Sequence, residues 1–234
     1  MGEGGRIMGV FLDPKKAFAS IAARPTWIVP IILMIIVGLA FVFLFTSRVG
    51  WDRYFHQIAE TNSRMQQMDA QTRESTIQTQ IKVGPIFGYI FGVIGPFLTA
   101  LIAGGVVLLM CKLASLSLTF KQTYAMSAWA MMPRVLAGVL AIVVMYTKRP
   151  EDFNLQNPIA FNIGAFLEPP PNTGKFIYSL ATSIDLFTIW SILLLAVGIT
   201  AAARKVSFSK AVILVAAPWI IWVLVASSFA GMFG

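Results

Sequence analysis

Long apolar segments recur five times along the chain, with more polar stretches between them. A helix of about 20 mostly apolar residues crosses ~30 Å of hydrocarbon, and each segment reaches or nearly reaches that length. A water-exposed helix would show polar positions at a period of about 3.6 residues, and residues 30–45 and 135–145 lack them. The pattern predicts an all-α fold, a polytopic membrane helix bundle with five transmembrane helices. The predicted spans are residues 27–45, 85–111, 124–146, 177–203 and 211–233.

The stretch before the first apolar segment predicts a short helix at the membrane interface. Asp13 is a suitable N-cap, a proline follows it at the first helical position, and Pro25 ends the pattern. Phe18 and Ile21 then fall on one face of the helix, away from its two lysines. Such a helix is either a simple entry into the membrane or a docking element for a partner or for anionic lipid, with Phe18 and Ile21 as candidate contacts.

Residues 47–82 form the one sizeable polar region. Trp51, Tyr54 and Phe55 open a series of apolar positions at spacings of three, four and seven, which is typical of an amphipathic helix. We therefore expect a long external amphipathic helix. Its three aromatic residues either rest on the membrane surface or contact a partner.

Glycines recur every fourth residue at the start of the second apolar segment, at Gly84, Gly88 and Gly92. Small residues at this spacing let two helix backbones approach closely, which is how helices associate in lipid. The glycine face is predicted to be a packing surface, either within the molecule or in a homodimer or heteromer.

Two apolar segments each contain one charged residue that we expect at mid-depth, Arg134 in the third and Asp185 in the fourth. A central arginine costs ~2.5–3.5 kcal/mol on the insertion scale, so Arg134 needs a partner or water. Asp185 is the opposite charge expected at comparable depth, and the two are predicted to form an intramembrane polar pair. The pair is either structural or part of a transport path.

Composition supports the membrane class, because 57% of the residues are hydrophobic and 12% are charged, against about 25% charged in soluble domains. The net charge of +8 is spread over loops rather than gathered on one face, so no nucleic-acid partner is expected. The short loops 112–123 and 204–210, together with residues 1–26, carry nine basic and two acidic residues. The longer loops 46–82 and 147–176 carry eight basic and seven acidic residues.

The density of basic residues in short loops sets orientation. It predicts a cytoplasmic N terminus and an external C terminus. Residues 1–26 form the cytoplasmic segment with its interfacial helix, and residues 27–234 form the five-span membrane domain, with 46–82 and 147–176 as its external loops.

Candidate chemistry is sparse. His56 is the single histidine and Cys111 the single cysteine, so a zinc site is not expected. A glycine-rich phosphate loop and the paired groups of intramembrane proteases are also missing from the sequence. The chain is predicted to be a non-enzyme with no cofactor and no metal.

Several further stretches form a recognisable pattern. They are Phe11-Leu-Asp-Pro-Lys-Lys-Ala-Phe18, residues 21–27, residues 117–125 with Met132-Pro133, residues 157–165, and residues 185–190 leading to Gly198. Together they resemble a bacterial Yip1-domain membrane protein over nearly the whole chain. The resemblance implies a bacterial inner-membrane protein with five spans and a cytoplasmic N terminus. Some bacterial members accompany ABC-type export machinery, which implies an accessory or scaffold role.

Two function classes follow from these observations. The first is a non-catalytic accessory, scaffold or assembly subunit of a larger membrane complex, surrounded by lipid and bound to a membrane-protein partner or to copies of itself. The second is a small oligomeric transporter or channel that uses Arg134 and Asp185.

Overall fold

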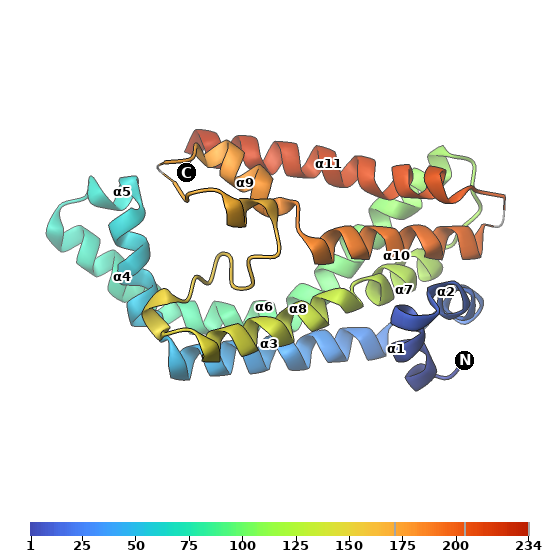
Figure 1. Ribbon diagram of the computed structural model, residues 1–234, viewed down its shortest axis with the longest axis horizontal. Helices are drawn as coiled ribbons and strands as arrows, with labels where there is room; N and C mark the ends of the chain where they lie inside the picture. Colours follow the sequence, from blue (N-terminus) through green and yellow to red (C-terminus); the bar gives the residue numbers. More distant parts are fainter. Residues whose placement is uncertain (171, 204, 234) are drawn as a thin grey trace.

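The computed structural model describes residues 1–170, 172–203 and 205–233. In these ranges the regular structure is helical, apart from one isolated antiparallel bridge. The molecule is elongated, with the N-terminal helices near one end of its long axis and residues 51–66 at the other (Figure 1). The all-α helix bundle predicted for a membrane protein is confirmed at this level.

The helices are given in chain order. They are α1 (Glu3–Leu12), α2 (Pro14–Ala23), α3 (Ile28–Arg48), α4 (Trp51–Thr61), α5 (Ser63–Gln66), α6 (Ala70–Leu113), α7 (Phe120–Ala130), α8 (Met132–Thr147), the 3-10 helices η1 (Pro150–Asp152) and η2 (Ile163–Phe166), α9 (Lys175–Ser183), α10 (Leu186–Ala202) and α11 (Phe208–Phe233).

Four stretches of the described chain are long and apolar enough to cross a membrane: α3, α6, the α7–α8 unit and α11. They contain the first, second, third and fifth predicted spans. The fourth is not one helix, because α9 ends at Ser183 and α10 begins at Leu186. With 17 residues, α10 is only ~25 Å long at 1.5 Å per residue. Five continuous spanning helices are therefore not confirmed.

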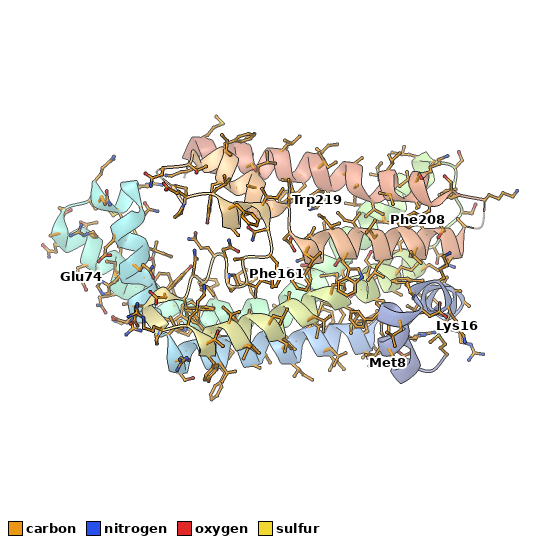
Figure 2. All side chains as sticks on the ribbon, in the orientation of Figure 1. Met8, Lys16, Glu74, Phe161, Phe208 and Trp219 are labelled. Carbon is orange, nitrogen blue, oxygen red and sulfur yellow. The ribbon has the colours of Figure 1, made fainter. Side chains whose placement is uncertain are left out.

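The helices form two groups that diverge from the N-terminal end (Figure 1). α3 packs on both α6 and α8 in one group, and α11 packs on α9 and α10 in the other. The segment between α8 and α9 folds back into the space between the groups, where Phe161 lies near the centre of the molecule (Figure 2). This returning segment positions the site described below.

The apolar face of the N-terminal segment is part of the core. α2 matches the predicted helix, since the Asp13 side chain accepts a hydrogen bond from the Lys16 amide and proline follows at the first position. Phe18 and Ile21 have no exposed surface and lie in the main buried cluster with Trp129. α2 packs against α7 and α10, so its apolar face contacts the chain itself, while its predicted position at the membrane interface stays a prediction.

A second N-terminal helix, α1, was not predicted from the sequence. Its Arg6 is 2% exposed and holds the segment together. The guanidinium donates to the Thr26 hydroxyl at 2.6 Å, the Ser20 carbonyl at 2.9 Å and the Arg24 carbonyl at 3.0 Å. It also donates to the Glu3 carboxylate at 3.1 Å. Because every arm of Arg6 has a partner, its charge is tolerated inside the fold.

The end of the molecule opposite the N terminus is a helical hairpin rather than one long amphipathic helix. Asn62 ends α4 and caps the short α5, and Asp69 then caps α6. α6 continues for 44 residues, so its first part belongs to the hairpin and its remainder to the second span. α4 packs back on α6, which removes the free external helix expected for residues 47–82.

Candidate functional site

Arg134 lies in the first turn of α8, just after the break in the third span. Pro133 has no amide hydrogen and its ring disfavours a helical turn before it, so α7 ends at Ala130. The chain resumes with a 2.9 Å bond from the Arg134 amide to the Met131 carbonyl. Arg134 is exposed and lines an open cavity.

Asp185 lies at the break in the fourth predicted span, where it is the N-cap of α10. Its Oδ1 accepts 2.9 Å hydrogen bonds from the amides of Phe187 and Thr188. The residues beside it pair with the returning segment: the Leu186 amide donates to the Phe161 carbonyl at 3.0 Å. Asp185 is thus a capping residue between two helices, whereas the sequence placed it inside one continuous helix.

Arg134 and Asp185 line the same cavity, whose volume is about 410 Å³. No hydrogen bond or ion pair of the Arg134 guanidinium is found in the part of the chain that the structure describes. The predicted pair is therefore brought into one space without direct contact, because the carboxylate is turned toward the α10 amides. The other polar residues of the lining are Gln156, Asn157, Asn162, Thr182 and Thr188.

The amide side chains in this lining were missed by sequence reasoning. Asn162 donates to the Asn157 side chain at 2.7 Å, and its own Oδ1 accepts from the Ala165 amide at 3.1 Å. Gly164 permits this arrangement, since a Cβ there would collide with Thr182. Residues 157–165 did stand out in the sequence through their resemblance to a family pattern, but nothing local indicated that they fold inward.

A second cavity of about 470 Å³ adjoins the first through Arg134, which lines both. Its walls come from α3, α6, α8 and residues 155–159, and Arg134 is the only charged residue among them. The other lining residues are mostly apolar or glycine. We call this second space the apolar groove and the first the polar cavity.

The predicted glycine face is used within the molecule. A Cβ on Gly84 would lie 2.6 Å from the Phe55 ring, and one on Gly88 would lie 3.3 Å from Trp51. On Gly92 it would meet Leu39 of α3 at 3.4 Å. The glycine face thus packs against the aromatic residues of α4 and against α3.

The aromatic contacts predicted at the start of α4 are half-buried against their own chain. Trp51 and Tyr54 pack on Phe45, with ring centroids 5.0 and 5.8 Å away. Burial also raises the pKa of Tyr54 above its usual value. These rings, like the fully buried Phe18 and Ile21, pack against other residues of the same chain, which the sequence did not reveal.

The described residues contain no group of three or more histidine, cysteine, aspartate or glutamate side chains placed to hold a metal ion. Cys111 is buried without a disulfide partner. The groups available for chemistry are those of the polar cavity: one guanidinium, one carboxylate engaged with backbone amides, and several side-chain amides and hydroxyls. This set recognises a charged or polar group.

Comparison with known proteins adds one match. The family model described as the Yip1 domain matches residues 8–230, which is nearly the whole chain. No curated protein and no solved structure matches. The match includes both helix breaks and the returning segment between α8 and α9.

Proposed function

This chain belongs to the Yip1-domain family of membrane proteins, and we propose that it is a non-catalytic protein that binds an acidic ligand at Arg134. The observation that carries this proposal is the Arg134 guanidinium, which forms no hydrogen bond or ion pair among the described residues and lines a cavity at a stretch long and apolar enough to span a membrane. An arginine at this depth is costly unless it is paired or hydrated. A bound anion supplies the missing pairing.

Asp185 supports this assignment by its geometry. Its Oδ1 accepts two backbone hydrogen bonds, and among the described residues it attracts the Arg134 charge across the cavity without an ion-pair contact. The hydrogen-bond donors of the Arg134 guanidinium are therefore available to a ligand. Neighbouring side chains supply further donors, since Asn157 and Asn162 carry amide groups and Thr188 a hydroxyl on the same lining. Charge-assisted bonds from arginine to a carboxylate or phosphate are the strongest that such a set can form.

Thermal unfolding of the detergent-solubilised protein tests the proposal with butyrate, inorganic phosphate and the neutral analogue butyramide. A ligand that binds only the folded state raises the melting temperature. We expect butyrate or phosphate to raise it and butyramide to leave it unchanged. The response should vanish in Arg134→Gln. It should persist in Arg149→Gln, which removes an exposed arginine bound to Asp152 outside the cavity. Equal responses in both variants, or none to either anion, would overturn the proposal.

We further propose that the N-terminal end faces the cytoplasm of a bacterial cell and the α4–α5 hairpin faces outward. The basic residues of the short loops support this orientation. In this orientation the two helix groups diverge toward the exterior, and the polar cavity between them faces that side.

A transport role for the same residues is the second candidate, and the two helix breaks favour it. Discontinuous helices that meet near the middle of a membrane are common at the binding sites of transporters. Flux of a bound anion into liposomes that contain the purified protein tests this role. Flux that Arg134→Gln abolishes supports transport, and binding without flux restricts the protein to a binding role.

The accessory role in a larger complex, including ABC-type export machinery, stays a proposal. It requires a surface on which a partner can bind. The residues predicted to contact a partner pack inside the chain: Phe18 and Ile21 in the core, Trp51, Tyr54 and Phe55 against α3 and α6. A partner or a second copy must therefore use another surface. Stoichiometric co-purification of an unrelated membrane protein would support this role.

A further inference from the structure

We propose that the ligand is an amphiphile, with an acidic head group at Arg134 and an acyl chain in the apolar groove. This inference rests on the proposed function and adds the ligand class. The head group is defined by its charge, so a carboxylate and a phosphate are both candidates. The carrying observation is that Arg134 lies where the polar cavity meets the apolar groove.

The two spaces differ sharply in chemistry. Beyond Arg134 the polar cavity presents Asp185 and several amide or hydroxyl side chains. The groove presents residues such as Val37, Phe41 and Phe91, with Thr99 as its remaining side chain that carries a polar group. A compact polar solute fits the cavity and leaves the groove unused. An acid with an acyl chain occupies both.

The shape of the groove follows from the glycines that line it. Gly38 and Gly92 let α3 and α6 approach closely, because a Cβ on Gly38 would lie 3.5 Å from the Gly92 carbonyl. Gly138 does the same for α8, where a Cβ would lie 2.6 Å from Val37. These contacts bring the three helices that line the groove close together. Along α3 the lining runs from Met34 to Phe41, roughly 10 Å at 1.5 Å per residue.

Gly95 provides a way to fill the groove without disturbing the helices. It lines the groove, and a Cβ built on it meets nothing within 4 Å. Gly105 lies on the same helix, also has open space around its Cβ, and is not part of the lining. Gly95→Leu therefore blocks the groove, and Gly105→Leu is its matched control.

The test measures binding of a stearate that carries a nitroxide part-way along its chain, within the length of the groove from its carboxyl group, in phosphatidylcholine nanodiscs at alkaline pH. Electron paramagnetic resonance separates the immobilised label from the mobile label in the bilayer. The methyl ester of the same molecule is the uncharged comparison, and a phosphatidic acid with the same label provides the phosphate head group. We expect one or both acids to show an immobilised component that the ester lacks.

Arg134→Gln should weaken that binding roughly tenfold or more, since it removes a charge-assisted hydrogen bond. Arg134→Lys should retain part of it, because the positive charge stays. Gly95→Leu should remove the immobilised component, and Gly105→Leu should leave it unchanged. Melting curves without ligand identify any variant that has lost its fold, and Gly95→Met then replaces Gly95→Leu as the groove-filling variant.

The outcomes separate this inference from the proposed function. One outcome is that butyrate stabilises the protein through Arg134 while Gly95→Leu does not change stearate binding. This outcome supports the site for an acidic ligand and overturns the acyl-chain assignment. Equal immobilisation of acid and ester in the parent and in Arg134→Gln identifies ordinary lipid around the protein and also overturns it.

Discussion

The indole Nε1 of Trp129 donates a 2.8 Å hydrogen bond to the carbonyl oxygen of Thr26. Trp129 has no exposed surface and belongs to the third predicted span, whereas Thr26 connects the N-terminal helices to the first. Gln122 adds a second link from α7, donating to the Ala22 carbonyl at 3.1 Å. The N-terminal segment is thus bonded to the bundle by directed contacts as well as by packing.

Trp129→Phe should lower stability by about 1 kcal/mol, because it removes the hydrogen bond and keeps most of the apolar ring. The Thr26 carbonyl then loses a buried partner. Chemical or thermal unfolding in detergent measures the change. Trp222→Phe is the control, since Trp222 is 68% exposed and its loss should have little effect. Equal stability of the two variants would contradict a structural role for the Trp129 bond.

Gly104→Ala should destabilise the contact between α6 and α7 by about 1–3 kcal/mol. A Cβ on Gly104 would lie 2.8 Å from the Tyr124 Cα, which is backbone and cannot turn aside. The neighbouring Gly105→Ala is a matched control, because a Cβ there meets nothing within 4 Å. The difference between the two melting temperatures reports the close approach, and a Gly104→Ala protein as stable as Gly105→Ala would show that the helices can separate freely.

Replacing Asp185 tests its role as a cap. Asp185→Ala should cost about 1 kcal/mol, since it leaves the amides of Phe187 and Thr188 without their acceptor. Asp185→Asn keeps a side-chain oxygen and should retain most of the stability. If both variants lose the same amount, the charge matters more than the cap, and electrostatic pairing with Arg134 is the better account.

The proposed orientation is tested by single cysteines in a Cys111→Ala background. Lys16 and Glu74 are both exposed and lie near opposite ends of the molecule (Figure 2). We expect Glu74→Cys to react with an impermeant thiol reagent in intact cells, and Lys16→Cys to react only after lysis. Labelling of Lys16→Cys in intact cells would reverse the orientation.

Local signals predicted local structure well. The cap at Asp13 and the apolar lengths of α3 and α11 depend on neighbouring residues, so the sequence identified them. The continuity of α6 through Ala70–Leu113 was missed because its first turns are polar and its later turns are apolar. A hydropathy pattern therefore divides this single helix into two segments.

The sequence predicted the two charged residues of the candidate site but not their positions relative to each other and to the helices. Arg134 and Asp185 stood out as ionisable residues in apolar segments, which is a compositional signal. The break at Asp185 depends on residues 161–163 returning to pair with residues 184–186, and no local pattern records such a distant pairing. The burial of Phe18 against Gly198 is equally non-local.

That contact has a consequence for the order in which the protein matures. Phe18 leaves the ribosome long before Gly198 and the rest of α10, because it comes much earlier in the chain. The apolar side chains of α2 that pack on α10 therefore stay uncovered until α10 has been translated and inserted. The docking of the N-terminal helices on α10 completes the fold. A defect in α10 would therefore first disturb the packing of these helices.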